Sequence, residues 1–238
     1  AAHEAAEFVI GKFGRESARH GIEGLTRKIE TLAAKHGDEA IEAVKKVGPR
    51  AFHLIDGVGE NGGKVIRLMA KFGNDAAVWV IERPKGLAIF VRYGDDGAEA
   101  LIRHRGIAEP VVESFGGSAI RALQAVDGQN GRRIAMMVQD GELARIGRTP
   151  ELLAVVSDYG DRAMDFVWRN KGALATATVL TAFLSDPRPF IDGTNDLTKV
   201  LAENTLSPLT QVPVRIPQAR NARSSKWRKP MNGPAISC

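Results

Sequence analysis

The reactive residues of this sequence show none of the spacings that common catalytic and metal sites require. The five histidines are His3, His20, His36, His53 and His104. They form no His-Glu-x-x-His motif, and the only cysteine is the last residue, Cys238. No Gly-x-Ser-x-Gly turn presents a nucleophilic serine. We therefore predict no catalytic residue, no metal site, no cofactor and no small-molecule substrate.

The most glycine-dense stretch, residues 56–64, invites comparison with a phosphate-binding loop. Counting back from Gly63-Lys64, the position that needs the first glycine of that motif holds Val58. Val65 stands where the motif has the Ser or Thr that binds magnesium. The stretch is therefore interpreted as a turn between helices.

The remaining polar candidates have simpler interpretations. His36 precedes a glycine at a place where other copies of the same pattern have Phe or Tyr, which favours a packing role. His104 stands between Arg103 and Arg105, which predicts a solvent-facing position. Asp186 and Asp192 flank a proline-rich loop, where aspartate is typical of turns.

An aromatic residue or histidine followed by glycine recurs along most of the chain. The pairs, called corners below, are Phe13-Gly14, His36-Gly37, Phe72-Gly73, Tyr93-Gly94, Phe115-Gly116 and Tyr159-Gly160. Further glycines at 48, 106, 128 and 172 follow corners by 11 or 12 residues. Glycine suits the left-handed position that ends a helix, and Asp or Asn directly after it suits the cap of the next helix.

Between the corners, apolar residues recur at spacings of three and four, as in Val65, Leu68, Met69 and Phe72. A short helix with one apolar stripe must bury that stripe against neighbours. We predict an all-α, solenoid-like array of short antiparallel helices with glycine corners. An irregular helical bundle is the alternative. The predicted divisions are a repeat domain at 1–185, a proline-containing linker and last helix at 186–207, and an extended or disordered basic tail at 208–238.

Two segments test the all-helical prediction. Residues 78–93 contain β-rich runs on both sides of Arg83-Pro84-Lys85-Gly86, a pattern that fits a hairpin. Pro84 also fits the first turn of a helix. We favour the helix. Residues 173–184 form an apolar run that is too short to cross a bilayer. A buried helix is favoured there, with membrane insertion as the alternative.

Positive charge is concentrated at the C-terminal end. Six of the 33 Lys and Arg residues lie beyond residue 203, where there is no Asp or Glu, so residues 1–203 hold 27 basic and 28 acidic residues. The predicted partner-binding residues of this tail are Arg215, Arg220, Arg223, Lys226, Trp227, Arg228 and Lys229. Cations with an indole among them favour an anionic partner: lipid, nucleic acid or an acidic protein groove. An inert, solubilising tail is the other interpretation.

From Phe13 to Thr194 the glycine-punctuated helices end in Phe183-Leu184-x-Asp-Pro-x-Pro-Phe-Ile-Asp-Gly-Thr. In these residues the chain resembles a group of uncharacterised, exported bacterial α-helical repeat proteins. The resemblance implies export and an ordered helical body, and it carries no activity. The start Ala1-Ala2-His3-Glu4, without Met, fits removal of a signal peptide or a trimmed chain. We expect a periplasmic or otherwise exported protein, with a cytoplasmic one as the alternative.

The main functional hypothesis is a non-enzymatic scaffold that presents a helical surface to a protein partner and holds an anionic partner with its tail. A membrane-associated protein that uses residues 173–184 and the cationic tail is the second hypothesis. A hydrolase with an unrecognised site is the third.

Overall fold

The computed structural model describes residues 1–14 and 21–193, and this part of the chain is helical throughout, without a strand. The α-helices are α1 (Ala2–Phe13), α3 (Gly21–His36), α4 (Asp38–Val47), α5 (Arg50–Gly57), α6 (Gly62–Phe72), α7 (Asn74–Ile81), α8 (Pro84–Arg103), α9 (Ala108–Ala125), α10 (Gly128–Gln139), α11 (Glu142–Ile146), α12 (Thr149–Leu174), α13 (Ala177–Ser185) and α14 (Arg188–Ile191). A 3₁₀ turn, η1 (Gly59–Asn61), precedes α6. The all-α prediction is confirmed.

The corner glycines break the helices, as predicted. Gly37 and Gly73 separate whole helices, while α8, α9 and α12 each bend at a corner glycine whose backbone leaves helical geometry. At Gly73, φ is 79° and ψ is −168°, a region that only glycine occupies readily. The predicted left-handed helical conformation is therefore wrong at this corner, because the backbone turns into a more extended state.

The predicted capping role of the next residue is also wrong at two corners. Gly37 and Gly73 themselves occupy the cap position, and Asp38 and Asn74 are the first helical residues. Asp38 still places negative charge in the first turn, where it complements the helix dipole. Gly172 is not a corner, because it lies within α12.

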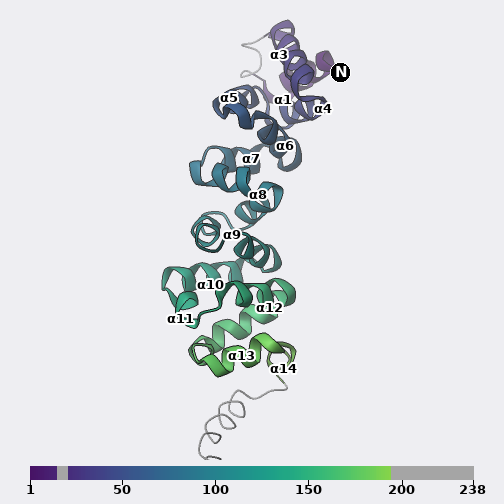
Figure 1. The fold of residues 1–238 in the computed structure, drawn as a ribbon. Coiled ribbons are helices and arrows are strands. Elements are labelled where there is room, and N and C mark those ends of the chain that lie inside the picture. Colours follow the sequence, from purple (N-terminus) through teal and green to yellow (C-terminus); the bar gives the residue numbers. More distant parts are fainter. Residues whose placement is uncertain (15–20, 194–238) are drawn as a thin grey trace, which may run out of the picture.

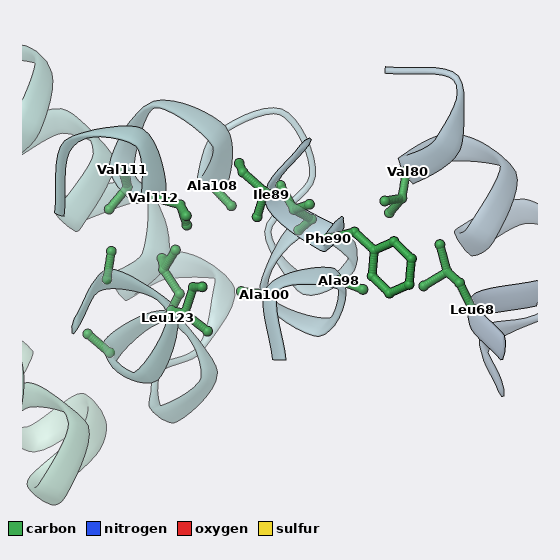
Figure 2. Packing of buried hydrophobic residues seen from close by; sticks show 14 of the residues in the cluster. Leu68, Val80, Ile89, Phe90, Ala98, Ala100, Ala108, Val111, Val112 and Leu123 are labelled. Atoms are coloured by element: carbon green, nitrogen blue, oxygen red, sulfur yellow. The ribbon is translucent and has the colours of Figure 1, made fainter. Parts of the chain in front are cut away.

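The helices bury one apolar stripe each. In α6 the buried side chains include Val65, Leu68 and Met69, which recur on one face as the spacing predicts. Figure 2 shows Phe90 of α8 directed toward Leu68 of α6 and Val80 of α7. The core is thus a series of such contacts between successive helices.

The helices follow one another in chain order along an elongated body, with the N-terminus at one end and α14 near the other (Figure 1). Each helix packs mainly on helices one to three places away in the sequence, as in α4 with α6, α8 with α9, and α9 with α12. Contacts of this kind leave long outer surfaces, and the candidate binding sites lie on them.

The two ambiguous segments are both helical. Residues 78–93 run through the end of α7 and the first half of α8, with Pro84 in the first turn, so the helical interpretation is confirmed. The apolar run 173–184 is divided, because α12 ends at Leu174 and α13 begins at Ala177. No helix in the described residues combines the length and apolar character needed to cross a membrane.

The linker predicted as extended from Asp186 contains a helical turn. Residues 188–191 form α14, and Phe190 is buried against Phe166 and Phe183, with ring centroids 5.8 Å away in both cases. Phe166 and Phe183 are stacked at 4.9 Å. Burial of an aromatic ring outweighs the extended preference of the two prolines. Residues 194–207, the remainder of the predicted linker and last helix, lie outside the described residues.

Candidate functional site

The seven tail residues predicted to bind a partner lie outside the described residues. They are Arg215, Arg220, Arg223, Lys226, Trp227, Arg228 and Lys229. The structure therefore places candidate sites only on the helical body.

The described part of the chain shows no cluster of metal-binding side chains. Within residues 1–14 and 21–193, no three His, Cys, Asp or Glu side chains lie close enough to hold a metal ion. His3 is exposed beside Glu7, with 3.5 Å between Nε2 and Oε1. Such an exposed pair is a common feature of helix surfaces.

His104 was predicted to face solvent, and this prediction is wrong. Its side chain is 2 % exposed. Its Nε2 lies 2.6 Å from the carbonyl oxygen of Leu123, so this nitrogen carries the proton and donates it. Nδ1 is buried with no hydrogen-bond partner in the described structure. Burial lowers the pKa of His104, although the Leu123 carbonyl opposes this shift.

The flanking residues explain the wrong prediction. Arg103 reaches the carbonyl of Gln124 at 2.8 Å, and Arg105 lies over the ring of Trp79, 5.6 Å from its centroid. Both arginines are near the surface, while the residue between them points inward at the end of α8. His104 points inward because it contacts Leu123 of α9 and lies against Gly131 of α10. The types of the residues next to it in the sequence do not reveal these contacts.

A ring packed against a glycine further along the chain is a recurring contact in this structure. A Cβ added to Gly48 would lie 2.9 Å from the ring of Phe13, and one added to Gly131 would lie 2.2 Å from Nδ1 of His104. A Cβ on Gly116 would lie 2.8 Å from the hydroxyl oxygen of Tyr93. The predicted packing role of the corner rings is thus seen at Phe13 and Tyr93, and it explains why some glycines are needed beyond their backbone conformation.

Ion pairs also connect neighbouring segments. The pairs that join residues 24 to 32 positions apart are Arg50–Glu82, Arg67–Glu39, Lys71–Asp95, Arg83–Glu109, Lys85–Glu113, Arg133–Asp165, Arg162–Asp192 and Lys171–Glu142. Most are exposed, and exposed pairs contribute only about 0–1 kcal/mol each. They also neutralise eight of the 24 Lys and Arg side chains in the described residues, which lowers the net charge of the surface along the body.

One open groove, of about 630 Å³, lies between the first halves of α8 and α9. Its floor includes Ile89 and Val112, and its rim includes Arg92 and Ser114. Lys85 and Glu113 face each other across it, with 3.0 Å between Nζ and Oε2. The groove thus combines an apolar floor with charged and polar side chains at its edge.

A second groove, of about 580 Å³, lies between α3 and α5 and is called the α3/α5 groove below. Its described lining residues are Gly24, Arg27, Lys28, Thr31, Leu32, Lys35, His36, Phe52, Ile55 and Asp56. Positive side chains come from α3, while α5 supplies an aromatic and an aliphatic residue. Sequence reasoning missed this groove because its two walls are separated by α4.

Comparison of the chain with family models, with curated proteins and with solved structures finds no match. The candidate sites are therefore judged on their geometry alone.

Proposed function

We propose that this protein is a non-enzymatic scaffold, a solenoid-like array of short antiparallel helices that presents its outer surface to a protein partner. Packing between helices close in sequence supports this proposal, because such an array exposes a long surface relative to its core. Ion pairs such as Lys71–Asp95 and Arg83–Glu109 link successive segments at the surface. The described residues then form a body suited to extended contacts.

The observation that carries the proposal is the pair of open grooves with apolar floors and charged rims. The α8/α9 groove combines Ile89 and Val112 with Lys85, Arg92 and Glu113. An apolar centre surrounded by polar side chains is the usual composition of a protein interface. The α3/α5 groove holds Thr31, His36 and Asp56, but the Thr31 hydroxyl donates to the carbonyl of Arg27 at 2.9 Å. No hydrogen bond among the described residues joins these three side chains, so binding accounts for the groove better than hydrolysis.

The basic tail, from Arg215 to Lys229, is part of the same proposal as a tether to an anionic partner. Its charge supports this role, since residues after Glu203 carry six basic and no acidic side chains. Anionic lipid, nucleic acid and an acidic protein remain the candidate partners. Residence in the periplasm or another exported compartment is likewise proposed, on the resemblance described above, with the cytoplasm as the alternative.

The structure favours the scaffold over insertion of residues 173–184 into a membrane. Val179, Leu180 and Phe183 of that run are buried inside the protein, and Phe183 also stacks on Phe166. Exposing them to lipid would require α13 to leave the core. Flotation with vesicles containing anionic lipid tests the membrane alternative on a chain that lacks residues 209–238, because in the full chain the tail alone could bind the lipid. Flotation of the shortened chain would favour insertion of residues 173–184.

Photo-crosslinking in the cells that make the protein tests the scaffold. A benzophenone amino acid is placed at Ser114, on the rim of the α8/α9 groove, and at Lys28, on the α3/α5 groove. The exposed Asp158 lines neither groove and serves as the control position. A discrete adduct with another protein from at least one groove position, absent at Asp158, is expected. Absence of any adduct at both groove positions contradicts the scaffold.

Deleting residues 209–238 tests the tether separately. The shortened chain should lose its association with the anionic partner while its helical content stays unchanged by circular dichroism. If fractionation of the shortened chain matches that of the full chain, the tether part of the proposal fails.

A further inference from the structure

The cations of the α3/α5 groove are not neutralised by ion pairs in the part of the chain that the structure describes. Arg27, Lys28 and Lys35 are exposed, and none forms an ion pair with a carboxylate among the described residues. Half of the 24 Lys and Arg side chains in the described residues form an ion pair, for example Lys71 with Asp95 and Lys85 with Glu113, whereas all three cations of this groove are unpaired there. The only carboxylate among the described lining residues, Asp56, belongs to α5 on the opposite wall.

The spacing of these cations defines a line along α3. Arg27 and Lys35 are eight residues apart, which is about 12 Å along a helix with a rise of about 1.5 Å per residue. Lys28 lies next to Arg27. Thr31 lies about one helical turn from Arg27 and about one turn from Lys35. Carboxylates two helical turns apart on a partner helix have the same separation.

The floor of the groove is apolar. Leu32 and Phe52 are half-buried and Ile55 is buried, so a ligand reaches their partly exposed apolar surface between the charged walls. Burying this surface supplies affinity, while the cations select the sign of the partner's charge.

From these observations we propose that the α3/α5 groove binds an acidic amphipathic helix of a partner protein. The apolar face of that helix lies on Leu32, Phe52 and Ile55, and its carboxylates pair with Arg27, Lys28 and Lys35. The inference rests on the proposed scaffold function and names the chemistry of one partner segment. Helices that dock by one apolar face are a common mode of peptide recognition.

Two other occupants fit the groove less well. The basic tail of the same chain carries charge of the same sign as the rim, because residues 204–238 contain no Asp or Glu. Single-stranded nucleic acid needs free aromatic faces for stacking. Among the described lining residues only Phe52 and His36 carry rings, and both are half-buried, so the groove offers no row of free aromatic faces.

Fluorescence anisotropy tests the proposal with a designed probe. The probe is a fluorescein-labelled 15-residue helical peptide with Glu on one face and Leu on the other, and its matched control replaces every Glu by Gln. The full chain should bind the Glu peptide at least ten times more tightly than the Gln peptide. This preference should shrink as NaCl is raised, because salt screens exposed charges.

Charge-reversal variants locate the binding site. Arg27→Glu and Lys35→Glu should each weaken binding of the Glu peptide at least tenfold. Arg121→Glu makes the same change at an exposed arginine outside both grooves and should change the affinity less than twofold. All three positions are exposed, so the variants should keep the wild-type circular dichroism spectrum.

Several outcomes overturn the proposal. Equal affinity for the Glu and Gln peptides, or equal weakening by Arg121→Glu and Arg27→Glu, removes the role of the groove cations. Tighter binding of a 15-residue oligothymidine that is lost in Arg27→Glu assigns the groove to nucleic acid instead. A dimer of the full chain in sedimentation velocity that Arg27→Glu dissociates assigns it to self-association. If Ser114 gives crosslinks but the Glu peptide does not bind, the scaffold function is supported and only the proposed ligand of the α3/α5 groove is wrong.

Discussion

The imidazole of His104 occupies the space that a side chain at Gly131 would need. A Cβ on Gly131 would lie 2.2 Å from Nδ1 and 2.5 Å from Cε1 of that ring, which is well inside van der Waals contact. The ring is held in place by the bond from Nε2 to the carbonyl of Leu123. At the junction of α8, α9 and α10, the ring of His104 thus packs against Gly131, which has no side chain to displace it.

Gly131→Ala should therefore destabilise the protein. Overpacking of a close-packed site costs about 1–3 kcal/mol, and the loss should be visible as an earlier midpoint in urea denaturation. Gly128→Ala is the matched control in the same helix, since its Cβ would meet nothing closer than Arg132 at 3.8 Å. That variant should be neutral or slightly stabilising. Equal effects of the two substitutions would contradict the packing argument.

The corner glycines should be sensitive for a different reason. A Cβ on Gly73 would meet no atom within 4 Å, yet φ is +79° there, so Gly73→Ala tests backbone strain alone. We expect a loss of about 1–3 kcal/mol. Gly48→Ala adds a clash with Phe13 at 2.9 Å to a φ of +80° and should cost more.

Gly172→Ala provides the control for the corners. Gly172 lies within α12 with a helical backbone and open space around its Cβ position. Replacement by alanine should stabilise the helix by up to about 1 kcal/mol. If Gly73→Ala and Gly172→Ala shift the urea midpoint in the same direction, the corner conformation does not require glycine.

Much of this architecture could be predicted from the sequence because it depends on local rules. Apolar spacing identifies the helices, and Gly37, Gly73, Gly94, Gly116 and Gly160 interrupt them where expected. The backbone state at the corners was not predictable in detail, since glycine permits several conformations and the packing of the next helix selects one.

The candidate sites could not be predicted in the same way because they depend on contacts between distant residues. His104 is buried because Gly131, 27 positions later, leaves room for it, and flanking arginines gave the opposite signal. The two walls of the α3/α5 groove come from helices that α4 separates in the sequence, so no local pattern brings their residues together. The tail residues Arg215–Lys229 were predicted from composition alone and stay a prediction.

Asp161 should matter more than its exposed neighbour in the same helix. One of its carboxylate oxygens accepts hydrogen bonds from the backbone N–H of Asp127 and from Nδ2 of the buried Asn130, both at 2.9 Å. Asp161→Ala removes both bonds and leaves Nδ2 of Asn130 only the longer contact with the backbone carbonyl of residue 161, at 3.4 Å. Loss of hydrogen bonds to a charged group costs about 1–3 kcal/mol.

Asp158→Ala is the control for this prediction, since Asp158 is exposed and has no side-chain partner among the described residues. That change should stay within about 0.5 kcal/mol. Hydrogen exchange gives a second measurement, because the amides at the start of α10 should lose protection in the Asp161 variant alone. Unchanged protection there would mean that the carboxylate does not hold α10 in place.

Acid should weaken the protein through His104. Burial lowers its pKa below the ordinary value of 6.5, because protonation would place a second N–H at Nδ1, where the described structure offers no acceptor. The nearby Arg103 and Arg132 add to this shift, while Asp127 and the Leu123 carbonyl oppose it. Since the unfolded chain binds the proton first, the full stability is present above pH 6.5 and is lost as the pH falls toward the folded pKa.

The measurement is the free energy of unfolding in urea at several values from pH 7.5 to pH 5, for the wild type and for His104→Gln. Glutamine can still donate to the Leu123 carbonyl but takes up no proton. The variant's stability should fall less steeply with pH, with a difference in slope of at most about 1.4 kcal/mol for each pH unit. Parallel curves would show that His104 is readily protonated in the folded chain and that its burial does not control the acid response.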